Sequence, residues 1–179
     1  MLARRLRVMA FELPSDLHPD MGPVAWMLGT WRGNGHGDYS TIDAFEFGQE
    51  LIFTHDGRPF FHYMARSWII DPETGEEVRK AAIETGFLRC KQTGMGVGKV
   101  EFVLTHNTGI VEVWIGNAEG GKLEIVTDAI GVTETAKPVQ GGKRLYGNVE
   151  GDLLYAYDMA AMDQPLQPHL WARLQRAKG

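Results

Sequence analysis

The side chains best suited to chemistry in this sequence are histidines, because a neutral imidazole can bind a metal or exchange a proton near neutral pH. His169 has the most informative surroundings, since Pro168 fixes its approach and an apolar alternation follows it. This pattern predicts an imidazole carried on a strand beside an apolar surface. Spacing alone leaves six candidate ligands open, namely His18, His36, His55, His62, His106 and His169.

A second candidate feature is the alternation of glycines at Gly33, Gly35 and Gly37. Glycine at every second position clears one face of a strand, so that a flat ligand or a neighbouring backbone can approach closely. The same spacing suits a bend at the corner of a barrel. Both interpretations stay open. A dinucleotide-binding loop is disfavoured, because no βαβ unit surrounds these glycines.

Several common catalytic signatures are absent from the sequence: the H-E-x-x-H zinc helix, the P-loop, the G-x-S-x-G elbow and the C-x-x-C-H haem attachment site. The single cysteine, Cys90, excludes an intramolecular disulfide and is compatible with a reducing compartment. The net charge of −5 argues against a broad surface for nucleic acid or anionic lipid. We therefore expect small-molecule partners, with no nucleic acid and no membrane.

The elements that must position these residues are predominantly strands. Glycine accounts for 22 of 179 residues, above the usual share of roughly 7%. Runs rich in β-branched and aromatic residues alternate with predicted turns at residues 56–57, 71–75, 93–98, 107–109, 117–121, 141–142 and 150–152. About ten such strands, without a helical pattern between them, predict an all-β fold, an antiparallel up-and-down barrel. A β-sandwich is the alternative.

Alternation within the runs predicts which residues share a face. Around residue 113, Val111, Val113 and Ile115 form an apolar face, opposite a mixed face of Glu112 and Trp114. Residues 122–127 alternate in the same way, with Leu123 and Ile125 on the apolar face.

The N-terminal part is expected to stand apart from the barrel. We predict a poorly ordered extension over residues 1–19 and one barrel domain over residues 20–179. Residues 17–28 favour a short helix, with Asp20 as its cap and Pro23 in the first turn. The apolar stretch of residues 8–11 is too short for a signal peptide. A cytoplasmic location is expected.

Several motifs, taken together, resemble one known family. The glycine strand belongs to L-G-T-W-R-G-N-G-H-G at residues 28–37. It is followed in order by E-T-G-F-L-R at 84–89, G-I-V-E at 109–112, R-L-Y at 144–146 and Q-P-L-Q-P-H-L at 164–170. This series is similar to that of the nitrobindin family over most of the chain.

The resemblance implies a ten-stranded barrel, shaped like fatty-acid-binding proteins, that holds ferric haem b in a cleft. His169 matches the histidine that binds the iron in that family, which makes it the metal ligand and the catalytic residue. The implied activity is reversible binding of nitric oxide and isomerisation of peroxynitrite to nitrate. Separately, we expect a monomer or homodimer.

Other cofactor contacts follow less directly from the resemblance. Gly33 and Gly35 would face the haem. Thr41 matches a threonine beside it, although β-propensity explains this residue equally well. Lys137 and Arg144 are candidate partners of the haem propionates, with a solvated cation as the alternative and the preferred one for Arg144.

One position departs from the family pattern. Many relatives carry a histidine two residues before the Glu of the E-x-G-[FY] motif, where this chain has Ala82. His36 is a candidate to replace it, and an exposed turn position is the alternative for His36.

Two other functions remain compatible with the same barrel. A non-enzymatic carrier would bind a fatty acid or another lipophile in an apolar interior, and an interaction module would have its interior filled by side chains. Uptake of hemin, seen as a Soret band, separates the haem protein from both.

Overall fold

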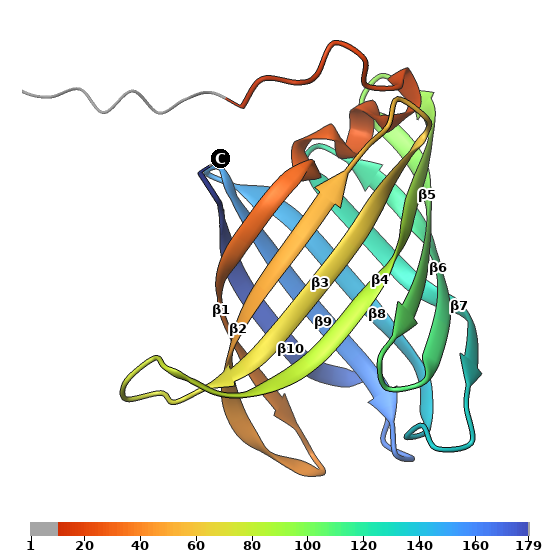
Figure 1. The fold of residues 1–179 in the computed structure, drawn as a ribbon. Helices are drawn as coiled ribbons and strands as arrows, with labels where there is room; N and C mark the ends of the chain where they lie inside the picture. Colours follow the sequence, from red (N-terminus) through yellow and green to blue (C-terminus); the bar gives the residue numbers. More distant parts are fainter. Residues whose placement is uncertain (1–10, 179) are drawn as a thin grey trace, which may run out of the picture.

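The computed structural model describes residues 11–178. Residues 1–10, the greater part of the predicted extension over residues 1–19, lie outside this range. Ten antiparallel strands form one closed barrel, in which each strand pairs with its chain neighbours and the first pairs with the last (Figure 1). The strands are β1 (Gly29–Tyr39), β2 (Ile42–Thr54), β3 (Phe60–Ile70), β4 (Glu77–Gly94), β5 (Val97–His106), β6 (Ile110–Glu119), β7 (Lys122–Val132), β8 (Val139–Val149), β9 (Asp152–Ala161) and β10 (Gln167–Arg176). The predicted all-β barrel is confirmed.

Most of the predicted turns connect strands, and glycines adopt left-handed conformations in them, such as Gly96 (φ 69°) and Gly151 (φ 87°). The turn predicted at Gly141 and Gly142 is wrong, because both residues lie within β8 and residues 133–138 form the connection before it. Gly142 instead permits close packing inside the barrel. A Cβ atom there would lie 2.6 Å from the Tyr157 ring and 2.9 Å from the Trp114 ring.

One end of the barrel is closed by η1, a 3₁₀ helix over Pro19–Met27 (Figure 1). His18, rather than the predicted Asp20, caps it: its Nδ1 atom accepts a hydrogen bond from the Asp20 backbone N–H at 3.2 Å. The Asp20 side chain binds outside the helix, where it accepts from the Lys91 ammonium at 3.1 Å and from the Gln92 backbone N–H at 3.2 Å. These contacts attach η1 to the β4–β5 hairpin.

The core fills this closed end. Trp31 is fully buried and its indole N–H donates to the Met27 carbonyl at 2.8 Å. The surrounding side chains are large and apolar or aromatic, and include Met21, Phe53, Phe61, Leu88, Phe102, Leu123 and Leu174. The interior is therefore solid near η1, and space for a ligand must lie toward the opposite end.

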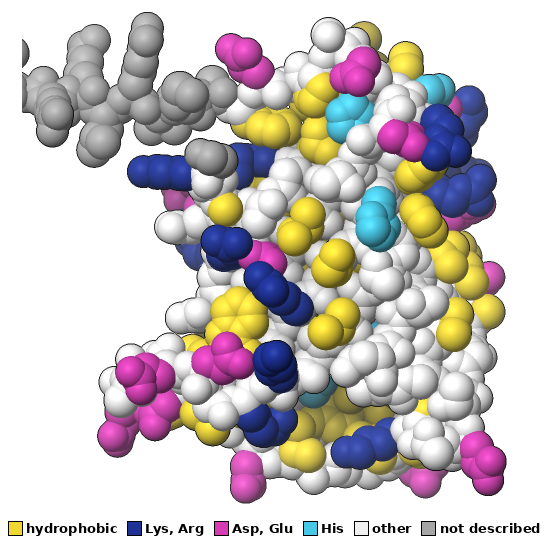
Figure 2. Space-filling view, viewed as in Figure 1, with side chains coloured by type: hydrophobic (Ala, Val, Ile, Leu, Met, Phe, Trp, Pro, Cys, Tyr) yellow, Lys and Arg dark blue, Asp and Glu magenta, His cyan; other side chains and the backbone are white. Residues whose placement is uncertain are grey.

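The wall of the barrel loosens toward that opposite end. The β7–β8 ladder stops at the pair Val126 and Lys143. Beyond this pair, β7 continues to Val132 against β6 alone, and β8 continues toward its start at Val139 against β9. In Figure 2 the surface is hollowed at this end, with apolar side chains inside and cations around the opening. No helix among residues 11–178 has the length and apolar character needed to cross a membrane.

The two predicted alternations behave differently. In β7, Leu123 and Ile125 are buried as the apolar face. In β6 the mixed face points inward: Glu112 and Trp114 are buried, whereas Val111 and Ile115 on the apolar face are exposed. The interior of this part of the barrel therefore contains a buried carboxylate, that of Glu112.

Candidate functional site

A cavity of about 550 Å³ occupies the open half of the barrel, within the usual range of roughly 300–1,000 Å³ for ligand and cofactor sites. Side chains from β2 to β6, from β8 to β10 and from the β7–β8 connection line it. Its apolar part includes Ala65, Ile110, Val139, Met159, Ala161, Met162 and Leu170, and its polar part includes Gln49, Glu84, His106, Glu112, Arg144 and His169. The interior is therefore not filled by side chains, which contradicts the interaction-module alternative.

His169 lies in the wall of this cavity because of a β-bulge. The ladder between β10 and β9 pairs Pro168 with Asp158 and then Leu170 with Tyr157, so His169 is the extra residue between them. Bulges re-aim the side chains they carry. The imidazole Nδ1–H donates to the Asp38 carbonyl at 3.0 Å, with the proton placed on Nδ1 because a carbonyl can only accept.

The surroundings of His169 favour a neutral imidazole. Burial lowers its pKa from the ordinary value, and the hydrogen bond to Asp38 opposes this shift only in part. The ring is held by the edges of Tyr39 and Tyr157, whose centroids lie 5.3 and 5.7 Å from its own. With Nδ1 committed to Asp38, Nε2 keeps a lone pair for a metal.

A single imidazole does not hold a bare metal ion in a protein. Among the described residues, no group of three His, Cys, Asp or Glu side chains is arranged to bind one. A metal at His169 would therefore need most of its ligands from a prosthetic group, and one protein ligand suits haem iron.

Of the other residues predicted to contact the cofactor, some line the cavity and others do not. Lys137, in the β7–β8 connection, lines the cavity and is exposed to solvent, so its ammonium lies at the rim. Thr41 is exposed in the β1–β2 turn and is not among the lining residues.

Gly33 and Gly35 do not line the cavity either. They pair with Leu174 and Ala172 of β10. A Cβ atom at Gly35 would lie 2.5 Å from the Phe47 ring and 2.8 Å from the Ala172 Cβ. Close packing of strands and rings thus accounts for these glycines, and their part in cofactor binding stays a prediction.

His36 lies on the outer side of the barrel wall. Its Nδ1 atom is 2.6 Å from the Glu46 carboxylate, and its ring packs near the exposed Trp171 at 6.0 Å. It is not among the residues that line the cavity. Ala82 does line this cavity, whereas His36 lines a second pocket that it shares with His169, so the replacement of the missing histidine by His36 stays a prediction.

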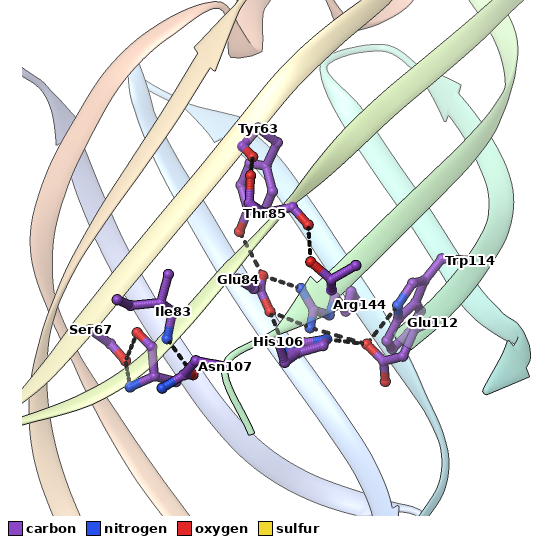
Figure 3. A network of polar contacts seen from close by, with 12 residues as sticks. Tyr63, Ser67, Ile83, Glu84, Thr85, His106, Asn107, Glu112, Trp114 and Arg144 are labelled. Carbon is purple, nitrogen blue, oxygen red and sulfur yellow. Dashed lines mark hydrogen bonds and ion pairs between the residues drawn. The ribbon is translucent and has the colours of Figure 1, made fainter. Parts of the chain in front are cut away.

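A buried polar cluster forms the inner wall of the cavity (Figure 3), and the sequence analysis missed it. Arg144 is only 2% exposed, so its interpretation as a solvated cation is wrong. Its two terminal nitrogens donate to the two Glu84 oxygens at 2.7 and 3.0 Å, and Glu84 also accepts from the Tyr63 hydroxyl at 2.7 Å. The guanidinium lies 4.8 Å above the Trp114 ring.

The cluster continues to His106 and Glu112. The His106 Nε2 atom lies 2.7 Å from the Glu112 carboxylate, which also accepts from the Trp114 indole at 3.0 Å. The other ring nitrogen of His106 lies 3.3 Å from Glu84. The members come from β3, β4, β5, β6 and β8. The only signal in the sequence was that Glu112 and Trp114 alternate with apolar residues along a strand. That pattern does not show which side chains Glu112 would contact.

Glu84 is expected to make stability depend on acid pH. Burial by itself raises a carboxyl pKa, but the charge and hydrogen bonds of Arg144 outweigh it and lower the pKa of Glu84 to about 2. An unfolded Glu titrates near 4.3, so the native state gains stability at higher pH and loses it as pH falls from about 4.3 through about 2. The gain is about 3 kcal/mol, at roughly 1.4 kcal/mol per pKa unit.

Urea unfolding between pH 5 and pH 2, an interval set by these two pKa values, measures this loss. Glu84→Gln should flatten the pH dependence. An equally steep loss of stability in Glu84→Gln would assign the acid sensitivity to other carboxylates.

Comparison with known proteins places the chain in a family. The family model described as THAP4-like, heme-binding beta-barrel domain matches residues 20–176. A peroxynitrite isomerase of Nocardioides sp. (strain ATCC BAA-499 / JS614) is 70% identical over 94% of this chain and 99% of its own length. A ferric nitrobindin-like protein of Cutibacterium acnes is 44% identical over 94% of this chain and 100% of its own. The crystal structure of Rv2717c from M. tuberculosis covers 90% of this chain and 99% of its own at 36% identity, with a TM-score of 0.77. The chain belongs to the family of THAP4-like heme-binding β-barrel domains, the nitrobindin family that its motifs resemble.

Proposed function

We propose that this protein is a haem b-binding peroxynitrite isomerase, which converts peroxynitrite to nitrate and binds nitric oxide reversibly at ferric iron. The observation that carries the proposal is the His169 imidazole, which is neutral, fixed through Nδ1 by the Asp38 carbonyl and set in a cavity wall. The names of the 70% identical relative and of the matching family support it.

The chemistry of the cavity wall fits a haem. Apolar side chains and aromatic rings around His169 suit the macrocycle. Lys137 offers a cation at the rim for a propionate. His169 would hold the iron through Nε2, and its hydrogen bond to Asp38 makes the ring a stronger electron donor and fixes its orientation.

Bound haem would supply a ferric Lewis acid at which the O–O bond of peroxynitrite breaks and the oxygen returns to nitrogen. The chain itself provides the ligand, the apolar shell and a fixed tautomer. Ala82 lines the cavity without a group that transfers protons. His106, the other histidine in the cavity wall, is hydrogen-bonded to Glu112. Isomerisation consumes and releases no proton overall, so this wall suits the reaction.

The proposal also includes peroxynitrite and nitric oxide as the small-molecule partners and the cytoplasm as the location. Cys90 is free and buried, which agrees with a reducing compartment. A monomer or homodimer remains the prediction for the oligomeric state.

Absorption spectroscopy and stopped-flow kinetics test the proposal. The purified, desalted protein should take up hemin with a saturable Soret band, and the loaded ferric protein should speed peroxynitrite decay with nitrate as product. A protein that stays colourless in the hemin titration and instead retains fatty acid would overturn the proposal in favour of the lipophile carrier.

A further inference from the structure

The five tyrosines of the chain are all buried, but their hydroxyl groups differ in their partners. The Tyr39 hydroxyl accepts from the Ala161 backbone N–H at 2.9 Å and contacts two carbonyls. The Tyr63 hydroxyl donates to Glu84, and that of Tyr146 accepts from Arg144 at 3.4 Å. Within residues 11–178, the hydroxyls of the other two tyrosines have no hydrogen-bond partner.

These two, Tyr155 and Tyr157, lie on the same face of β9 and both line the cavity. Tyr157 is packed edge-on against the His169 ring, at 5.7 Å between centroids and an interplanar angle of 66°. Tyr155 is packed against Tyr146 instead, at 5.1 Å. Tyr157 therefore combines a free hydroxyl, access to the cavity and contact with the proposed iron ligand.

We infer that Tyr157 is a site of covalent nitration by peroxynitrite that enters the cavity, and that the other four tyrosines are spared. The inference rests on the proposed function, because that function brings the reagent to this cavity. Its chemistry is the replacement of one ring hydrogen, ortho to the hydroxyl, by a nitro group.

The reaction balances with peroxynitrous acid as the only reagent. Its O–O bond breaks to give a hydroxyl radical and nitrogen dioxide. The hydroxyl radical takes the phenolic hydrogen atom and leaves as water. Nitrogen dioxide then forms a C–N bond with the ring, whose displaced proton returns to the phenol oxygen. The peroxide is reduced and the ring is oxidised, so tyrosine and peroxynitrous acid give 3-nitrotyrosine and water.

The electrostatics of the cavity do not distinguish Tyr157 from Tyr155, because burial raises the pKa of both hydroxyls. The Arg144 guanidinium lies 4.9 Å from the Tyr157 ring and 6.0 Å from the Tyr155 ring. Because both rings face the same cation, Arg144 does not favour one ring over the other as the site of nitration. Contact with His169 is the feature that only Tyr157 of the two has.

Mass spectrometry of the hemin-loaded protein tests the inference. Peroxynitrite is added in small portions, the protein is digested, and fragment ions assign nitrotyrosine to individual residues. Tyr157→Phe and Tyr155→Phe are a matched pair, since each removes one free hydroxyl and keeps the ring. We expect Tyr157→Phe to lose most of the nitrotyrosine and Tyr155→Phe to retain it.

The outcomes distinguish the inference from the proposed function. Nitration spread evenly over the tyrosines, or unchanged in Tyr157→Phe, overturns the inference alone if the loaded protein still speeds peroxynitrite decay. Failure to take up hemin and to speed decay overturns both.

Discussion

Replacing His169 with alanine is expected to abolish hemin binding while the barrel stays folded. The substitution removes the cavity imidazole whose Nδ1 is held by the Asp38 carbonyl, which leaves Nε2 for the iron. The loss of affinity should exceed the roughly 10- to 100-fold that removal of a supporting partner of a ligand costs. Hemin titration followed at the Soret band gives the affinity, and circular dichroism reports the fold.

His36→Ala is the matched control, because this histidine lies outside the cavity and is paired with Glu46. It should bind hemin as the unmodified protein does. A normal Soret band in His169→Ala, or its loss in His36→Ala, would contradict the assignment of the ligand.

Arg144→Met is expected to lower the free energy of unfolding by about 3–5 kcal/mol, the usual cost of removing one partner of a buried ion pair. Glu84 would stay buried without its bidentate partner, and Glu112 would lose the cation 3.9 Å away. Methionine fills much of the same space, so the loss would come mainly from uncompensated charge. Equilibrium unfolding in urea measures it.

The pair Lys122 and Glu124 provides the control, since both side chains are about half exposed at 3.2 Å. Lys122→Met should change stability by no more than about 1 kcal/mol. The double variant Glu84→Gln with Arg144→Met should recover part of the loss, because it removes both charges of the pair. If Arg144→Met were as harmless as Lys122→Met, the cluster would not be a stabilising element.

The fold was predictable because its local signals agree. Glycines that need positive φ, such as Gly96 and Gly151, mark real turns, and alternation in the segment that forms β7 matches its burial. The prediction of a turn at Gly141 and Gly142 was wrong. In sequence, a glycine that makes room for Tyr157 and Trp114 cannot be distinguished from a glycine that forms a turn.

The polar cluster could not be predicted, because its members meet only through strand register. Glu84 and His106 become neighbours through the β4–β5 ladder, and Arg144 reaches Glu84 across the barrel from a position 60 residues away in sequence. Period-two alternation also cannot tell which face is interior. In β6 the apolar face is outside, because the buried Glu112 has partners and can be accommodated.

For the candidate site, the sequence indicated His169 but not the structural feature that orients its side chain. The β-bulge is a property of two strands together, so the local pattern of Pro168 and Leu170 cannot reveal it. Likewise, glycine is needed at positions 33 and 35 because β10 and Phe47 pack closely there. The spacing of glycines along one strand does not reveal these contacts.

Closure of the barrel also determines when, during synthesis and folding, the candidate site can form. The last strand, β10, carries His169 and completes the wall by pairing Trp31 with Arg176 and Gly37 with Leu170. Pairing of segments so distant in sequence pays a large entropy of loop closure and comes late in folding. On the ribosome, nine strands can emerge before the segment that both closes the barrel and carries His169, the proposed ligand. With His169 in that role, we expect haem capture to be a post-translational event that waits for the final strand.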